Sequence, residues 1–275
     1  MIPQEDPPLS VKMLDSRINE TAGSDVLTRR NFRIMAMVVV AQMLPAGAIK
    51  GGTAMKIRMG NHARFSLDLD VARAMDLEVF VSELQENLRV GWNGFTGTLI
   101  TEKQAKSVGV PFGYVMAPFR VKLNFMGLSW RSVSLEVGHD ELGDTLDSEM
   151  RMDSEIIELF TSVRLPAPRP VALIAPKHQI AQKLHAASGV ESSRAHDLVD
   201  LQLLIANEVV DLGEVKTICV RLFNYRKLHS WPPTIVENEE WDSLYSEAAD
   251  GIRVLPSVGE AVRWANNLVA QIESS

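Results

Sequence analysis

A pair of glycines at positions 51 and 52 places the strongest constraint on how this chain can fold. The residues before them read Ala-Gly-Ala-Ile-Lys from position 46, and Thr53 and a run of helix-forming residues follow. Glycine readily interrupts a strand or a helix, so the segment predicts a short strand, a tight break and a helix. From Ser66 to Ala72 apolar and polar residues alternate, which predicts a second strand.

Two aspartates lie on that second strand. Side chains at positions i and i+2 of a strand point to one face, so Asp68 and Asp70 project together. Two carboxylates placed in this way repel each other, and divalent cations remove that cost. A pair of such ions can hold the attacking and leaving oxygens of a phosphoryl transfer. An Asp-x-Asp pattern is common by chance when taken singly, but its place after the glycine break indicates a metal-dependent nucleotide site.

The glycine break itself suits a phosphate-binding loop. Gly51 and Gly52 let the backbone approach a triphosphate closely, and the amides, the Thr53 hydroxyl and the helix start would hold its negative charge. A third carboxylate could come from Glu136, which alternates with apolar residues over 132–137. If that strand neighbours the aspartate strand, Glu136 reaches the metal ions. Otherwise it is a solvent-facing residue on an edge strand.

A second group of charged residues lies in the C-terminal half. Lys183 belongs to one predicted helix, and Arg194, Asp197 and Asp200 follow at i+3 spacing on the next. Lys183 could face a triphosphate, with Asp197 or Asp200 orienting it or acting as a base. The alternative is a salt bridge between the two helices.

The segment from Arg221 to Trp231 interleaves basic and aromatic residues, with Arg226 and Lys227 at its centre. Such a segment can pair with phosphates and stack on RNA bases. The alternative is aromatic packing beneath a loop. The formal net charge of −7 argues against sequence-independent binding of duplex DNA, so a nucleic-acid partner must meet a local patch.

The order of predicted elements favours an α+β fold. A mixed sheet with helices is expected over residues 1–150, and a mainly helical domain that completes the active-site cleft over 151–275. The single cysteine, Cys219, excludes an intramolecular disulfide and a four-cysteine zinc site. The longest apolar run, at 34–41, is far shorter than the roughly 18 residues of a membrane span. We therefore expect a cytoplasmic protein with no membrane partner.

Three stretches together resemble a known family. They read KGGTAMKIRMGNHARFSLDLDVA at 50–72, PKHQIAQKLHAAS at 176–188 and RAHDLVDLQLL at 194–204. The combination is similar to the AbiEii/AbiGii family of nucleotidyltransferase toxins, and more distantly to the DNA-polymerase-β-like nucleotidyltransferases. The resemblance implies a nucleotidyltransferase-like sheet in the N-terminal domain.

The resemblance also implies residue roles. Gly51, Gly52 and Thr53 would form the nucleotide loop, and Asp68 and Asp70 would be metal ligands. Lys183 would bind the triphosphate and Asp197 would be the late catalytic aspartate, with Asp200 as the second candidate. Arg64 and Ser66 match the Arg-x-Ser that leads into the aspartates, and so belong to the expected nucleotide site.

The function implied is that of a metal-dependent toxin from a toxin–antitoxin or phage-defence pair. Such enzymes use Mg²⁺ or Mn²⁺ to transfer a nucleoside monophosphate from an NTP to an acceptor, which is expected to be the 3′ end of tRNA, and so block translation. The expected partner is a cognate antitoxin encoded by a neighbouring gene. The alternatives are a non-catalytic nucleotide-binding member and an enzyme that nucleotidylates a protein.

Overall fold

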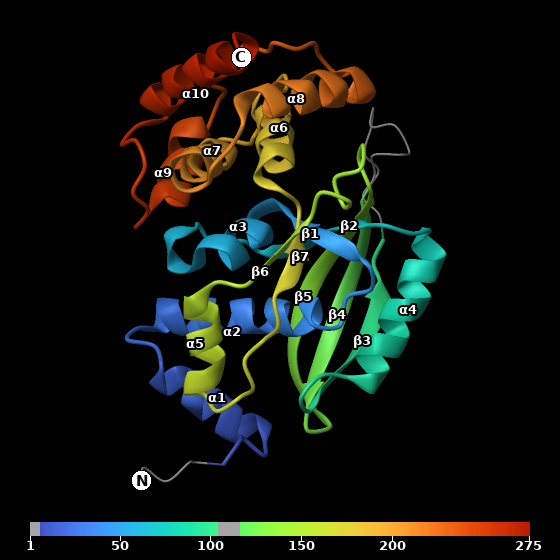
Figure 1. The fold of residues 1–275 in the computed structure, drawn as a ribbon. Helices are drawn as coiled ribbons and strands as arrows, with labels where there is room; N and C mark the ends of the chain where they lie inside the picture. Colours follow the sequence, from blue (N-terminus) through green and yellow to red (C-terminus); the bar gives the residue numbers. More distant parts are fainter. Residues whose placement is uncertain (1–5, 104–115) are drawn as a thin grey trace. The chain divides into compact units, whose positions relative to one another are not determined.

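The chain divides into two compact units, each of which is described by itself. The computed structural model describes residues 6–103 and 116–275 (Figure 1). The first unit comprises Met1–Gly60, Ser66–Asp140 and Ser148–Leu173. The second comprises Asn61–Phe65, Glu141–Asp147 and Ile174–Ser275.

The first unit is a mixed sheet with helices packed on it. Its helices are α1 (Val11–Glu20), α2 (Asp25–Ala41), α3 (Gly51–Met59), α4 (Leu77–Val90) and α5 (Ser154–Ser162). Its strands are β1 (Gly47–Lys50), β2 (Asp68–Arg73), β3 (Phe95–Thr101), β4 (Ala117–Phe125), β5 (Leu128–His139), β6 (Glu149–Arg151) and β7 (Val171–Leu173). A short 3₁₀ turn, Gly60–His62, follows α3.

The sheet has the strand order β3-β4-β5-β2-β1-β7-β6. The central strand β2 pairs antiparallel with β1 and parallel with β5, and β1 pairs parallel with β7. The register aligns Ile49, Val71 and Val137 across three strands, and all three side chains are buried. Because alternate residues of a strand face opposite sides, this row fixes which side chains lie on the other face of the sheet.

The core of the first unit forms where α2 packs on β5 and against α1 and α5. Every residue from Ile34 to Ala41 on α2 is buried. The helix begins after Ser24, whose hydroxyl accepts a hydrogen bond from the amide of Leu27, and Asp25 suits the positive end of the helix dipole. An aromatic cluster extends this core, with the Phe95 ring 4.6 Å from Phe125 and 5.1 Å from Trp130.

The second unit is mainly helical. Its helices are α6 (Pro176–Ala187), α7 (His196–Asn207), α8 (Leu212–Arg226), α9 (Trp241–Ala249) and α10 (Val258–Glu273). Helix α6 packs on α7 and α8, and α10 packs on α7, α8 and α9. The buried Tyr245 joins three segments, since its hydroxyl donates to the Leu255 carbonyl and accepts from the Gln202 side chain.

A histidine on α6 lies in the core of this unit. The ring of His185 is 4.7 Å from Phe223 and 4.5 Å from His229. Its Nδ1 atom lies 3.3 Å from Nη1 of Arg226, and must accept that hydrogen bond because a guanidinium has only donors. The ring proton therefore sits on Nε2, which is buried and has no hydrogen-bond partner among the described residues. Burial, helped by Arg226, lowers the pKa of His185 to about 3.

The α+β class expected from the sequence is confirmed. The expected boundary at residue 150 falls inside the first unit, because β6, α5 and β7 return to the sheet and β7 pairs with β1. The alternation of apolar residues from Tyr114 to Met126 also predicts a strand, and the first two residues of that range lie outside the described residues. In the described parts of the chain, no helix has both the length and the apolar character to cross a bilayer.

The aromatic cluster predicts a large effect of one core substitution. Phe95→Ala removes a fully buried ring and should lower the free energy of unfolding by about 3–5 kcal/mol. Leu128→Ala, at an exposed position near the same cluster, is the matched control and should change it by less than about 0.5 kcal/mol. Urea unfolding followed by circular dichroism measures both, and equal effects would contradict the packing described.

The pKa of His185 predicts acid sensitivity. The folded pKa lies below the unfolded value, so the unfolded chain binds the extra proton and stability is lost as pH falls below about 6.5. Between pH 7 and pH 5 the loss from this residue should be about 1–2 kcal/mol. His185→Asn keeps an acceptor for Arg226 but does not titrate, so its urea midpoint should depend less on pH. His62→Asn, at an exposed position, should keep the wild-type dependence.

Candidate active site

The sheet brings three carboxylates to one face. In the parallel pairing of β2 with β5, Asp70 lies directly beside Glu136, and Asp68 lies beside Ser134. These side chains are half-buried, whereas Leu69, Leu135 and the residues in register with them are buried on the other face. Strand β5 lies between β4 and β2, so Glu136 is on an interior strand. We call Asp68, Asp70 and Glu136 the acidic row.

The glycine loop lies directly against this row. Gly51 has a φ of +65°, which side-chain-bearing residues rarely adopt. A Cβ at this position would lie 2.1 Å from Oδ2 of Asp70, so the Asp70 carboxylate occupies the space that the missing side chain leaves. Lys50, the last residue of β1, pairs in register with Asp70. Strand β1 therefore brings Lys50 to one side of Asp70, and β5 brings Glu136 to the other side. Sequence reasoning gave Lys50 no role, although its position just before the glycines was a usable signal.

Two hydroxyl groups hold the strand that carries the aspartates. Oγ1 of Thr53 donates a hydrogen bond of 2.6 Å to the carbonyl oxygen of Asp68, and Oγ of Ser66 donates one of 3.3 Å to the same oxygen. Thr53 is completely buried. In this arrangement Thr53 and Ser66 fix the backbone of Asp68, and a direct contact of either hydroxyl with phosphate stays a prediction.

The acidic row fits a magnesium or manganese ion in its donor chemistry. Both ions prefer carboxylate oxygens, and Mg²⁺ commonly takes one or two carboxylates while substrate phosphates supply further ligands. Within the described residues, no group of three His, Cys, Asp or Glu side chains is arranged to hold an ion by itself. Asp68 and Asp70, with Glu136 adjacent, would hold such an ion together with a nucleotide.

The second unit contains a buried network of ion pairs centred on Lys183. Nζ of Lys183 donates to Oδ1 of Asp197 at 2.8 Å and to Oδ2 of Asp200 at 2.5 Å. Nε and Nη2 of Arg64 contact the two oxygens of Asp200 at 3.0 and 2.9 Å, and Nε of Arg194 donates to Asp197 at 2.8 Å. Both carboxylates are fully buried. We call these five residues the Lys183 network.

The charges of this network set its protonation state. Burial alone would raise the pKa of Asp197, but the Lys183 ammonium and the Arg194 guanidinium outweigh it and hold the pKa well below its usual range. Burial lowers the pKa of the neighbouring His196 to about 4, so this ring is neutral at pH 7. The Lys183 ammonium has three N–H donors, and the two aspartates take two of them.

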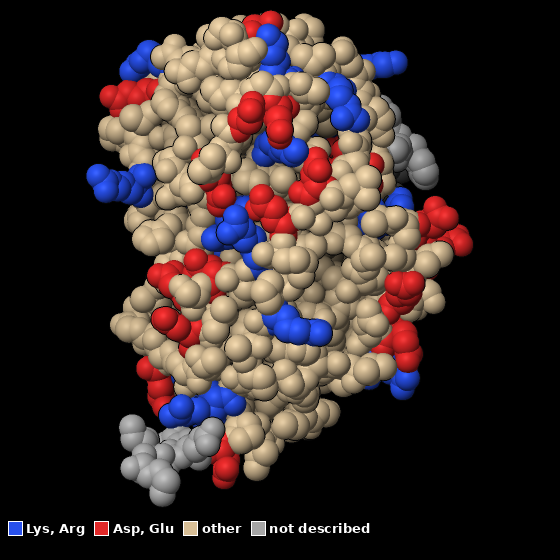
Figure 2. Space-filling view, in the orientation of Figure 1, with Lys and Arg blue, Asp and Glu red and all other residues tan. Residues whose placement is uncertain are grey.

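The segment from Arg221 to Trp231 is occupied largely with contacts inside the second unit. The Phe223 ring is buried and packs 5.4 Å from Trp231, and Arg226 pairs with Glu141 at 2.5 Å. Arg221 donates to the carbonyl oxygen of Leu142. These contacts are those expected if the aromatic residues of this segment pack beneath a loop, which is the alternative to RNA binding. Figure 2 shows acidic and basic side chains interspersed over the visible face of the molecule, without a continuous basic surface there.

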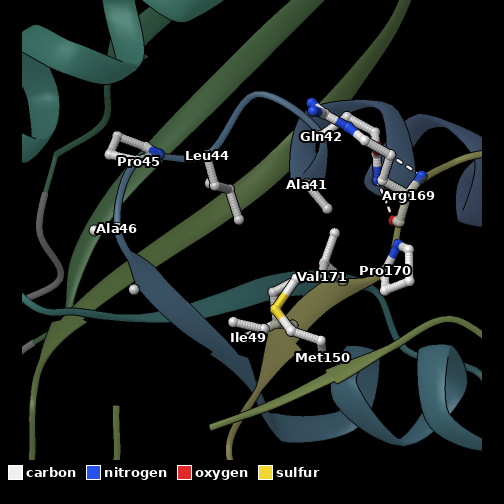
Figure 3. A pocket seen from close by; sticks show the side chains of 12 residues that line it. Ala41, Gln42, Leu44, Pro45, Ala46, Ile49, Met150, Arg169, Pro170 and Val171 are labelled. Carbon is white, nitrogen blue, oxygen red and sulfur yellow. Dashed lines mark hydrogen bonds between the residues drawn. The ribbon is translucent and has the colours of Figure 1, made fainter. Parts of the chain in front are cut away.

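An apolar cavity of about 630 Å³ lies beside β1 (Figure 3). It is lined by the end of α2, the start of β1 and residues of β6 and β7. Two hydrogen bonds join its rim, from the Gln42 amide to the Arg169 carbonyl oxygen and from the Arg169 backbone N–H to the Gln42 side chain. Gly47 and Ile49 of β1 line this cavity, whereas Lys50 and the residues of the acidic row do not.

The chain matches a protein-family model and is similar in fold to solved structures. The chain matches the family model described as nucleotidyl transferase AbiEii toxin, type IV toxin–antitoxin system, over residues 33–266. Among solved structures it is similar to MenT4, a nucleotidyltransferase toxin from Mycobacterium tuberculosis, at 18% identity and a TM-score of 0.53, covering 96% of this chain and 99% of that chain. It is also similar to JHP933 from Helicobacter pylori, at 15% identity and a TM-score of 0.46, covering 92% and 94%.

No curated protein matches the chain. The likeness to MenT4 concerns the fold, since the identity is low. The family match covers most of the chain and includes the glycine loop, the acidic row and the Lys183 network. The chain belongs to the AbiEii family of nucleotidyltransferase toxins of type IV toxin–antitoxin systems.

Proposed function

We propose that this nucleotidyltransferase toxin transfers the monophosphate of an NTP to the 3′ end of a tRNA, and does so with Mg²⁺ or Mn²⁺. The nucleotide and metal parts of the proposal rest on the acidic row lying against the Gly51 loop, where the Asp70 carboxylate fills the space that a side chain at Gly51 would take. The tRNA acceptor is proposed from the resemblance to the toxin family. An RNA acceptor places the reaction in the cytoplasm. Membership of the family implies an antitoxin partner, and we propose that a neighbouring gene encodes it.

The first unit supplies the groups that bind and orient the nucleotide. Helix α3 begins at Gly51, so its first amides can hold phosphate oxygens at the positive end of the helix dipole. Asp68 and Asp70, with Glu136, would hold the metal ion. When bound, that ion would neutralise part of the negative charge on the phosphates. In the proposed transfer the acceptor hydroxyl attacks the α-phosphorus and loses its proton to solvent, and the bond to the pyrophosphate oxygen breaks, so that pyrophosphate leaves.

The Lys183 network is proposed to contact the triphosphate through Lys183. Asp197 and Asp200 hold the ammonium in place, and Arg64 holds Asp200 through two contacts. The low pKa of Asp197 makes this carboxylate a weak proton acceptor, which supports an orienting role over that of a general base. Both late catalytic candidates, Asp197 and Asp200, contact the Lys183 ammonium, and we propose that they act through this lysine.

The role of the acidic row is tested by nucleotide transfer. Asp68→Asn and Asp70→Asn should each reduce transfer by at least about 100-fold, because a ligand charge is lost, and should leave the fold intact. The assay incubates the protein with each labelled NTP, Mg²⁺ and total tRNA or cell lysate. Label that is lost on nuclease treatment identifies an RNA acceptor, and label lost on protease treatment identifies a protein. Glu83→Gln, an exposed acidic residue of α4, is the control.

Wild-type rates in both aspartate variants would show that the acidic row is not the metal site. Transfer by the wild-type protein to none of the acceptors, with any of the four NTPs, would favour the non-catalytic nucleotide-binding alternative.

The role of Lys183 is tested by separating nucleotide binding from stability. Lys183→Met leaves two buried aspartates without their shared ammonium and should cost about 3–5 kcal/mol of stability. In protein that remains folded by circular dichroism, NTP affinity should fall about tenfold, and Lys183→Arg should restore part of it. Lys177→Met, at a half-buried lysine on the same helix, should bind NTP normally. Normal NTP affinity in folded Lys183→Met would leave only the salt-bridge interpretation.

A further inference from the structure

A lysine lies next to the acidic row on the neighbouring strand β1. Lys50 on β1 pairs with Asp70 on β2, and Asp70 pairs with Glu136 on β5, so the three residues form a line across three adjacent strands. Residues that pair in register lie on the same face of a sheet. A cation and two carboxylates therefore share this face at one level of the sheet.

The Lys50 side chain extends across β2 toward β5. A Cβ built on Gly138 of β5 would lie 3.2 Å from Nζ of Lys50 and 3.8 Å from its Cε. Neighbouring strands are about 4.8 Å apart, so β1 and β5 are separated by roughly 10 Å with β2 between them. Only a side chain that crosses β2 can bring Nζ to this place.

The register locates this crossing beside the carboxylates. Lys50 is opposite Asp70, and Gly138 is opposite Ala72, the next residue of β2 on the same face. The lysine stem therefore passes over β2 between Asp70 and Ala72. Glu136 lies two residues before Gly138 on β5, on the same face. Gly138 has no side chain, and the Met116 sulfur and the Lys50 ammonium both lie beside the space that this leaves.

We propose that Lys50 is the resident counter-ion of the acidic row and competes with a divalent cation for it. This inference rests on the proposed function, because it takes the acidic row to be the metal site. The like charges of Asp70 and Glu136 repel each other, and the Lys50 ammonium offsets that repulsion when no metal ion is bound. A metal ion that enters alone must displace this positive charge.

A bound nucleotide shifts the competition between Lys50 and the metal ion in favour of the metal ion. Lys50 directly precedes Gly51, where α3 and the proposed phosphate loop begin. Its flexible stem allows the displaced ammonium to pair with triphosphate oxygens, which also bring their own negative charge to the row. Lys50 thus makes metal binding weak without nucleotide and strong with it. It is a positioning residue that links occupancy of the metal site to occupancy of the nucleotide site.

The proposal is tested by Mn²⁺ titration of the full-length protein, followed by electron paramagnetic resonance. Without nucleotide, Lys50→Met should bind Mn²⁺ about tenfold more tightly than the wild type, because the competing charge is gone. With a non-hydrolysable NTP analogue and Mn²⁺, the same variant should bind the analogue several-fold more weakly. A residue with only a structural role would not change these two affinities in opposite directions.

Three further variants complete the experiment. Lys50→Arg keeps the charge and should bind Mn²⁺ with nearly wild-type affinity, and Lys50→Gln gives the same readout as Lys50→Met if the latter folds poorly. Lys122→Met removes an exposed lysine of β4, outside the acidic row, and should behave as wild type. Circular dichroism confirms that each variant is folded.

Asp70→Asn separates failure of this proposal from failure of the proposed function. If Asp70→Asn abolishes Mn²⁺ binding while Lys50→Met and Lys50→Gln leave it unchanged or weaker, the Lys50 role is overturned and the metal site stands. If Asp70→Asn leaves Mn²⁺ binding unchanged, the acidic row is not the metal site and both proposals fall. Tighter Mn²⁺ binding in the Lys50 variants that is lost on adding Asp70→Asn supports both.

Discussion

The in-register pairing of β1, β2 and β5 is the constraint on which the candidate site depends. On one face it aligns Ile49, Val71 and Val137 in the core, and on the other it aligns Asp70 with Glu136. A shift of one residue would send every apolar side chain to the wrong face. Burial of apolar surface, worth about 25 cal/mol per Å², therefore holds together carboxylates that repel each other. The acidic row is a consequence of packing on the opposite face.

In the helical unit, buried charged side chains are stabilised because each one is paired with side chains of the opposite charge. Asp197 and Asp200 are removed from water, and each shares Lys183 with the other while contacting an arginine of its own. An ion pair in this environment is retained only when nearly all its donors and acceptors are satisfied. The network therefore holds Lys183 in one position, which is the property a phosphate-binding lysine requires.

Local sequence patterns predicted strands and helices well, but they did not predict which residues of other elements each side chain contacts. The alternation at 66–72 and the glycine break correctly placed a strand, a break and a helix, since both depend on near neighbours. The burial of the Thr53 hydroxyl against the Asp68 carbonyl depends on how α3 packs on β2, which no local pattern encodes. The same is true of Phe223, whose ring packs on residues from α6 and the 229–231 loop.

The sequence by itself determined the α+β class, the family and the identity of the chemical groups, because periodicity and short motifs depend on residues close in the chain. It also determined that Asp68 and Asp70 share a face, since alternation along a strand is a property of the backbone. Only the tertiary structure decided that Glu136 neighbours Asp70, that residues 148–173 return to the sheet and that the Lys50 side chain reaches across β2. These depend on which strands pair and in what register, and that choice is made by the burial of the whole core.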